Sequence, residues 1–208
     1  MSETLGHAFV ILDVIGLTVF AITGALVAAR KEMDPVGFMV VGTATAIGGG
    51  TIRDLVLGIR PVFWVDDPSY LVISLTAALA TFWAAKLFSR IFPLLLWLDA
   101  LGMALFAVAG AQKAVAVGAP AVVAIVMGVM TASFGGLIRD IFCGEKPLMF
   151  HREIYATAAG IGAVAWLALH QLVGLPPLIE TTIAIAVGFA VRAAAIIWGL
   201  HFPHYKPR

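Results

Sequence analysis

The sequence contains one short pattern twice, glycines followed by an arginine and an aspartate: Gly48-Gly49-Gly50-Thr51-Ile52-Arg53-Asp54 and Gly135-Gly136-Leu137-Ile138-Arg139-Asp140. Each copy lies inside a long apolar segment, with its glycines near the middle and its arginine and aspartate closer to one end. Ionisable residues inside a segment that can span a membrane are rare, because lipid does not solvate charge, and they face the interior of a helix bundle. The doubled pattern therefore indicates a helix bundle, with the two arginine-aspartate pairs as candidate site residues in its interior.

The composition of the chain is that of a membrane protein. Of its 208 residues, 62% are hydrophobic and 12% are charged, and the mean hydropathy is +1.03. Water-soluble domains carry about 25% charged residues, so a soluble fold could not cover its surface with so few. The net charge of +1 and the lack of a basic run give no reason to expect a nucleic-acid partner. Cys143 is the only cysteine, which excludes a disulfide within the chain.

Seven apolar segments approach the length of roughly 20 helical residues that a bilayer requires. They lie near 8–29, 36–59, 69–89, 93–112, 119–143, 152–172 and 178–200. Long apolar runs without two-residue alternation indicate helices rather than a barrel. The connections are too short for a second domain, so the sequence predicts one all-α transmembrane domain over residues 1–208.

The orientation of the spans follows from lysine and arginine, which concentrate in cytoplasmic connections. Arg60 and Lys113 are the basic residues expected on one side. The connections after spans one, three and five, with the C-terminal tail, hold Arg30, Lys31, Lys86, Arg90, Lys146, Arg152, Lys206 and Arg208. The sequence therefore predicts an outside N-terminus and a cytoplasmic C-terminus.

The two halves of the chain are related by a displacement of 86 residues without a gap. This displacement aligns Asp13 with Asp99, and it aligns the two glycine-arginine-aspartate patterns. Repeat 1 covers about 8–89, repeat 2 covers about 93–172, and the seventh helix, about 178–200, stands outside them. Each repeat holds three spans, an odd number, so the two copies face opposite ways, as in the inverted repeats of many transport proteins.

Consecutive glycines in the middle of spans two and five predict broken helices. Glycine destabilises a helix interior by about 1 kcal/mol, and an unwound segment exposes carbonyls that suit a cation. The candidate bend and pore residues are Gly48, Gly49, Gly50, Gly135 and Gly136, with the neighbouring hydroxyls of Thr45, Thr131 and Ser133. Close helix packing is the alternative, because small residues also let two backbones approach each other.

The buried charges are expected to form two layers, one on each side of the glycines. The outer layer comprises Asp13, Arg53 and Asp54, and the inner layer comprises Asp99, Arg139, Asp140 and Arg192. Matching depths predict that Asp13 pairs with Arg53 and that Asp99 pairs with Arg139. Two alternatives stay open: the pairs are structural clamps between helix ends, and Arg192 is a side chain that snorkels to the cytoplasmic interface.

Other chemistry has little support in the sequence. His201 and His204 flank a proline in the tail, which is a poor arrangement for a metal site. We found no catalytic triad, zinc-protease or phosphate-binding signature. We therefore expect no metal, no cofactor and no enzymatic activity.

The doubled pattern, with Gly58 and Gly144 following its two copies, resembles the bacterial and archaeal branch of the trimeric intracellular cation (TRIC) channels, a family also described as glycine transporters. The resemblance covers nearly the whole chain. It implies a homotrimer in the bacterial or archaeal cell (inner) membrane, with one pore per protomer at the glycine bends of helices 2 and 5. That pore passes monovalent cations, chiefly potassium, with sodium as a second candidate ion.

The resemblance also raises the question of lipid partners. Animal relatives carry a lysine-glutamate pair near a bend and bind an inositol lipid there. This chain has no such pair beside Gly48–Gly50 or Gly135–Gly136, so membrane lipid is expected only as a general partner. Besides the channel, the sequence leaves open a secondary transporter for a small zwitterion such as glycine, and a scaffold that transports nothing.

Overall fold

The fold is entirely helical in the computed structural model, which describes residues 2–87, 91–150 and 154–200. Seven helices are long and apolar enough to cross a membrane, so the predicted architecture is confirmed. Several residues used above lie outside the described part of the chain: Arg90, Arg152, His201, His204, Lys206 and Arg208.

The helices agree closely with the predicted spans. They are α1 (Ser2–Arg30), α2 (Pro35–Val56), α3 (Phe63–Asp66), α4 (Ser69–Ala84), α5 (Ile91–Ala116), α6 (Ala121–Phe142), α7 (Ala156–Ala168) and α8 (Pro177–Trp198). Short turns extend α4 to Leu87 and α7 to Val173. The short helix α3 was not predicted; it lies in the connection between the second and third spans.

Both copies of the repeated pattern end their helix in the same way. Gly58 and Gly144 have φ of 71° and 63°, a left-handed conformation that glycine adopts without strain. The next amide in each copy donates back to the carbonyl of the motif aspartate, Ile59 to Asp54 and Glu145 to Asp140, both at 2.8 Å. The glycines that follow the motifs are therefore helix stop signals.

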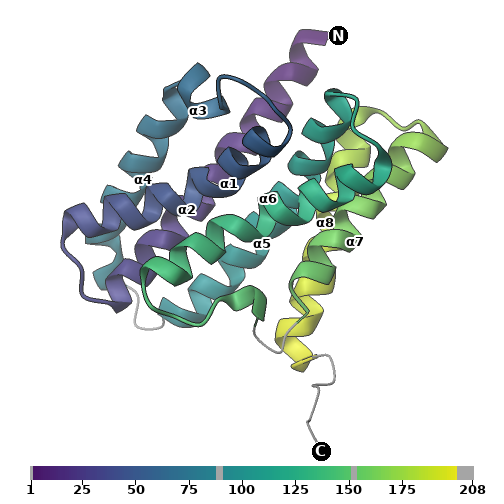
Figure 1. Ribbon diagram of the computed structural model, residues 1–208. Helices are drawn as coiled ribbons and strands as arrows, with labels where there is room; N and C mark the ends of the chain where they lie inside the picture. The colour runs from purple at the N-terminus through teal and green to yellow at the C-terminus, as the bar shows by residue number, and fades with distance from the viewer. Residues whose placement is uncertain (1, 88–90, 151–153, 201–208) are drawn as a thin grey trace, which may run out of the picture.

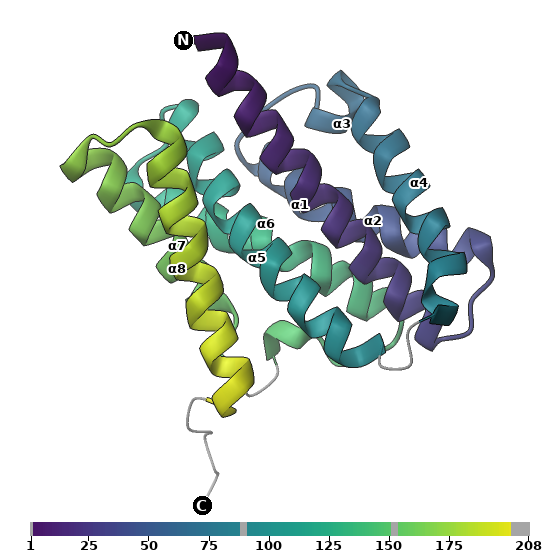
Figure 2. The ribbon, with the colours of Figure 1, turned by 180° about the vertical axis from the view of Figure 1, so that it is seen from behind.

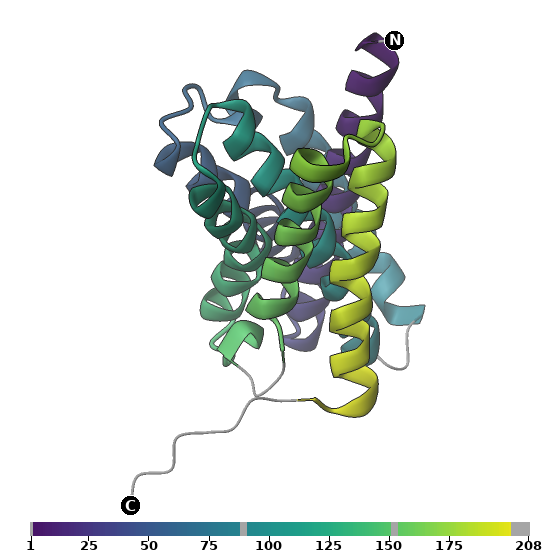
Figure 3. The same cartoon turned by 90° about the vertical axis from the view of Figure 1, so that its right-hand side faces the viewer.

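The seven long helices form two three-helix units and one further helix (Figure 1). Helices α1, α2 and α4 pack on one another, α5, α6 and α7 form the second unit, and α8 packs on α5 and α7. Figure 2 shows α1 and α5 side by side and running in opposite directions, as an inverted repeat requires. Figure 3 shows α7 (green) beside α8 (yellow) on the side of the molecule that faces the viewer. We call the end of the molecule at which α1 begins the N-side, and the opposite end, where α8 ends, the C-side.

Helices α2 and α6 cross at the centre through their glycines. A Cβ atom on Gly49 would lie less than 3.0 Å from the Thr131 carbonyl oxygen, and one on Gly135 equally close to the Thr45 carbonyl oxygen. Both helices run through this region as uninterrupted α-helix. The predicted unwinding of these helices is therefore wrong. The glycines instead allow the two backbones to pack closely, as the packing alternative proposed.

Further contacts across the centre recur at the same displacement of 86 residues. The rings of Phe20 and Phe106 meet edge to face, with centroids 5.1 Å apart. Phe106 packs on Gly16, and Phe20 packs on Gly102. The two aromatic side chains therefore interlock the repeats at the centre of the molecule.

Candidate functional site

The C-side charged layer is a network of ion pairs around Arg139, in which Asp99 Oδ2 and Arg139 Nη2 are buried without a hydrogen-bond partner among the described residues. Arg139 Nη1 donates to Asp99 Oδ1 at 2.7 Å, and Arg139 Nε donates to Asp140 Oδ1 at 2.7 Å. Asp140 Oδ2 also accepts from the Leu148 amide at 2.8 Å. All three charged side chains are buried. Buried charges persist only when partners replace their lost water, and here the predicted pair of Asp99 and Arg139 is confirmed.

The N-side layer reproduces part of this network. Arg53 Nε and Nη2 contact Asp54 Oδ1 at 2.8 and 2.7 Å, and Asp54 Oδ2 accepts from the Phe63 amide at 3.0 Å. Asp13, the counterpart of Asp99, makes no hydrogen bond or ion pair with any described residue. The predicted pair of Asp13 and Arg53 is therefore wrong. Arg53 turns to its neighbour Asp54 and to the ring of Phe63, 5.8 Å away, and a cavity separates it from Asp13.

Arg192 is buried within the protein, with 1% exposed. Nη1 donates to the Ile154 carbonyl at 3.3 Å, and the guanidinium stacks over the Tyr155 ring at 5.1 Å. Because it is buried, the interpretation as a snorkelling side chain is wrong; Arg192 ties α8 to the segment that precedes α7.

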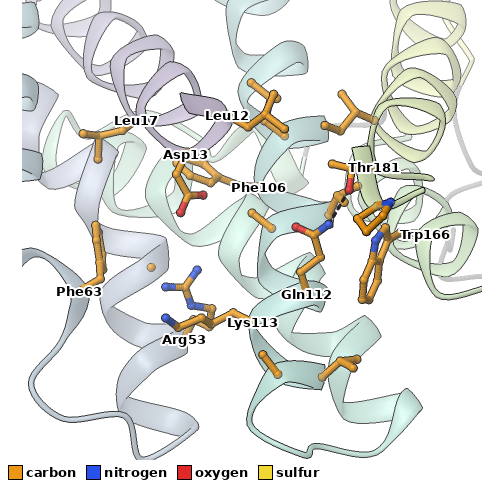
Figure 4. A pocket seen from close by; sticks show the side chains of 18 of the residues that line it. Leu12, Asp13, Leu17, Arg53, Phe63, Phe106, Gln112, Lys113, Trp166 and Thr181 are labelled. Atoms are coloured by element: carbon orange, nitrogen blue, oxygen red, sulfur yellow. Dashed lines mark hydrogen bonds between the residues drawn. The ribbon is translucent and has the colours of Figure 1, made fainter. Parts of the chain in front are cut away.

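A cavity of about 530 Å³ opens on the N-side between the two repeats and α8 (Figure 4). Its charged and polar lining includes Asp13, Arg53, Gln112, Lys113, His170, Glu180 and Thr181. Asp13 lies across the cavity from Arg53 and Lys113 in Figure 4. Sequence reasoning missed Gln112, Lys113 and Glu180 as lining residues. A signal for Lys113 and Glu180 was present, since each charge lies only three residues inside a membrane-spanning helix.

The far wall of this cavity is held by polar contacts between α5, α7 and α8. Gln112 Nε2 donates to Thr181 Oγ1 at 2.7 Å. His170 Nδ1 lies 3.0 Å from Glu180 Oε1, and the His170 ring stacks on Trp166 with centroids 4.9 Å apart. The Glu180 carboxylate, 3% exposed, therefore already has a partner in this wall.

A second cavity, of about 330 Å³, lies on the C-side. It is lined by Arg30, Phe92, Leu95, Asp140, Glu145, Lys146 and Leu148. The Glu145 carboxylate forms ion pairs with Arg30 Nη1, at 3.2 Å, and with Lys31 Nζ, at 3.6 Å. These pairs connect the end of α1 with the segment after α6. The two charged layers thus border two cavities that open at opposite ends of the molecule.

The glycines predicted to line a pore have different surroundings in the structure. Gly50 lines the N-side cavity. A Cβ on Gly136 would lie 3.5 Å from Arg139 Nη2 and 3.6 Å from Asp99 Oδ1. Gly48 packs against Ile138 instead.

The predicted hydroxyl groups are all buried. Those of Thr45 and Thr131 donate to carbonyls of their own helices, Val41 and Met127, at 2.6 Å. The Ser133 hydroxyl makes no hydrogen bond with any described residue. Among residues 2–87, 91–150 and 154–200, no group of three or more histidine, cysteine, aspartate or glutamate side chains could hold a metal ion.

Comparison with known proteins places the chain in a family. The family model described as glycine transporter matches residues 10–86 and 96–171. The chain belongs to this family. The chain is also similar to the inner membrane protein YadS of Escherichia coli, 40% identical over 93% of this chain and 94% of that protein. The membrane protein YvgT of Bacillus subtilis is 40% identical over 76% of this chain and 78% of that protein.

Solved structures connect this glycine transporter family with the TRIC channels. The TRIC trimeric intracellular cation channel orthologue from Rhodobacter sphaeroides is 50% identical, with a TM-score of 0.90, covering 93% of this chain and 99% of that one. Another TRIC cation channel structure is 35% identical, with a TM-score of 0.85 and coverage of 95% and 97%. These relatives are channels and membrane proteins, not enzymes, and the chain is an integral membrane protein.

Proposed function

We propose that the protein is a channel for monovalent cations, chiefly potassium, which assembles as a homotrimer with one pore in each protomer. The observation that carries the proposal is the Asp13 carboxylate, which lines the N-side cavity without an ion pair among the described residues. A carboxylate that lines a cavity between apolar walls raises the local concentration of cations there. Support comes from the high identity to a TRIC cation channel.

The proposed pathway joins the N-side cavity to the C-side cavity. Arg53 borders the first cavity and Asp140 borders the second. Phe106 lines the N-side cavity, and the buried Phe20 packs against its ring. Apolar constrictions close a pore by excluding water, so we assign the constriction to this aromatic pair.

The predicted site residues receive separate roles in this proposal. Gly50 and Gly136 belong to the walls beside the two charged layers, and the buried Ser133 hydroxyl is a candidate cation ligand on the way. Gly48, Gly49 and Gly135, with Thr45 and Thr131, hold the helices together. In the C-side layer, Arg139 forms ion pairs with both Asp99 and Asp140, in keeping with the clamp interpretation. Passage there requires that this clamp loosen.

The channel proposal predicts a cation-selective current. The purified protein would be inserted in a planar bilayer with a potassium chloride gradient, where we expect a reversal potential close to that of potassium. Asp13→Asn should lower the preference for potassium over chloride several-fold, most clearly at low salt, where screening is weakest. Asp66→Asn, an exposed carboxylate outside the N-side cavity, is the matched control. A reversal potential of zero in the wild type contradicts the proposal.

The proposed assembly and placement have their own tests. Native mass spectrometry of the purified protein should give the mass of three chains. The proposed location is a bacterial or archaeal inner membrane, with the N-side outside; the curated name of YadS supports the inner membrane. A monomeric mass under conditions that preserve channel activity would contradict the trimer.

A secondary transporter for a glycine-like zwitterion is the second candidate. Asp13 and Lys113 present opposite charges to the same cavity, and the family model carries the description glycine transporter. Saturable uptake of labelled glycine into liposomes, lost on Lys113→Gln, would favour this candidate. Flux that rises linearly with glycine concentration counts against it.

A further inference from the structure

We infer that the N-side cavity binds a zwitterionic phospholipid. Its headgroup lies between Asp13 and Lys113, and one acyl chain follows the apolar wall of α5. This inference concerns lipid binding and does not require that the protein conduct ions. It rests on three properties of the cavity: its unpaired charges, their depth, and the apolar surface below them.

Two charges of the cavity, one of each sign, form no hydrogen bond or ion pair with a described residue; Asp13 interacts with Arg53 and Lys113 only across the cavity. Arg53 is bonded to Asp54 at 2.7 Å, and Glu180 has His170 at 3.0 Å. Asp13 and Lys113 make no hydrogen bond or ion pair with any described residue. A ligand that satisfies both must carry a cationic and an anionic group. An ammonium group for Asp13 and a phosphate for Lys113 meet this requirement, and charge-assisted hydrogen bonds to such groups are strong.

Three charged residues of the cavity wall lie at the depth of lipid headgroups. Arg53, Lys113 and Glu180 are each three residues from the N-side end of their helix, at Val56, Ala116 and Pro177. Three residues correspond to about 4.5 Å along a helix axis. A polar ring so close to the helix ends matches the polar boundary of a bilayer rather than its hydrocarbon core.

Below this ring the cavity becomes apolar. Its wall is formed by Leu105, Val108 and Ala109 of α5, facing Leu17 of α1 and Ile185 of α8. Leu105 lies eight residues from Lys113 on the same helix, about 12 Å deeper. An acyl chain that hangs from a headgroup at Lys113 therefore meets a continuous apolar surface.

The cavity lies next to surfaces that face lipid. In the view of Figure 2, α1 and α8 stand on either side of α5. On these two flanking helices Ile15 is 44% exposed and Ile179 is 48% exposed. The inference requires that these exposed apolar faces border lipid rather than a neighbouring protomer, so that a lipid reaches the cavity sideways. A small water-soluble zwitterion uses neither this route nor the apolar wall, which is why we favour a lipid over glycine here.

The mass of bound lipid tests the inference directly. The full-length protein, purified in mild detergent, would be incubated with equal amounts of phosphatidylethanolamine and phosphatidylglycerol and examined by native mass spectrometry. The wild type should retain phosphatidylethanolamine in preference. Asp13→Asn and Lys113→Gln should each lower its retention by about tenfold or more, the effect of losing one charge-assisted hydrogen bond. Ala109→Phe, which fills the apolar wall without changing charge, should lower retention as well.

Controls and alternative outcomes keep the test decisive. Asp67→Asn and Lys86→Gln change exposed charges outside the N-side cavity and should have no effect; circular dichroism and gel filtration verify that each variant is folded. Equal retention of both lipids, displacement of the lipid by excess glycine, or insensitivity to all three cavity variants would each overturn the inference. A wild type that retains no lipid would also overturn it and would leave the cavity to water or a neighbouring protomer.

A bound headgroup has a consequence for conduction that rests on the proposed function. At Asp13 it occupies the mouth of the proposed pathway and competes with cations, so added phosphatidylethanolamine should lower the current of the wild type. The mass measurement does not depend on any current. A protein that binds the lipid but passes no ions would therefore refute the channel and leave the lipid site intact.

Discussion

Alanine in place of Gly49 should destabilise the protein, because the new methyl group has no room. It would lie less than 3.0 Å from the Thr131 carbonyl oxygen, a distance that real Cβ atoms essentially never show. The obstacle is backbone in the centre of α6, so α2 and α6 must move apart. Overpacking of this kind typically costs about 1–3 kcal/mol. For a chain of this size, that lowers the melting temperature by roughly 2–12 °C.

The assay is thermal unfolding of the purified protein in one detergent, followed by circular dichroism. Gly160→Ala is the matched control, because its nearest new neighbour, Val129 Cγ2, is 3.6 Å away. Gly135→Ala should behave like Gly49→Ala, since its methyl meets the Thr45 carbonyl at the same crossing. The double variant should lose less than the sum of the two, because one separation of the helices accommodates both methyl groups.

The outcome that refutes this reasoning is simple. If Gly49→Ala melts at the wild-type temperature, the two backbones are not in contact at this point. The glycines would then act through backbone flexibility, as the sequence alone suggested. Fully additive losses in the double variant would show that the methyl groups are accommodated independently.

Two further predictions concern the charged layers and the orientation of the chain. Asp99→Asn should lower the free energy of unfolding by about 3–5 kcal/mol, because it removes one of the two carboxylates that pair with the buried Arg139 charge. Asp13→Asn should change the free energy of unfolding by less than about 1 kcal/mol. Equal losses for the two variants in thermal unfolding would contradict this difference between the two charged layers. In a Cys143→Ser background, Asp67→Cys on the N-side should react with a membrane-impermeant maleimide added to intact cells, and labelling only after permeabilisation would reverse the predicted orientation.

The architecture could be predicted because lipid leaves few alternatives. Apolar length determines the number of spans, and charges inside them must find partners within the protein. Asp99 and Arg139 meet as their depths predicted. The short helix α3 could not be foreseen, since it lies in a connection between spans.

The details of the centre depend on tertiary contacts that a single sequence does not display. Glycine is a poor helix former in isolation, yet at Gly49 the crossing with α6 maintains a regular helix. Arg53 pairs only with its neighbour Asp54 among the described residues, whereas Arg139 pairs with both Asp140 and Asp99. The repeated motif is the same in both copies, so it does not predict this difference. Lys113 was assigned to a connection because the predicted span ended one residue too early to include it.

The reciprocal contact between Gly49 and Gly135 bears on how such a chain could arise. Equivalent residues touch across it, so it has the form of an isologous interface, in which the same patch serves on both partners. Two identical three-helix chains inserted in opposite directions could form it unaided. In such a pair, every substitution would appear twice, and an aspartate that is bonded on one side would be bonded on the other. Fusion into one chain removes that constraint, and only then can Asp13 stay open to a cavity while Asp99 is committed to Arg139.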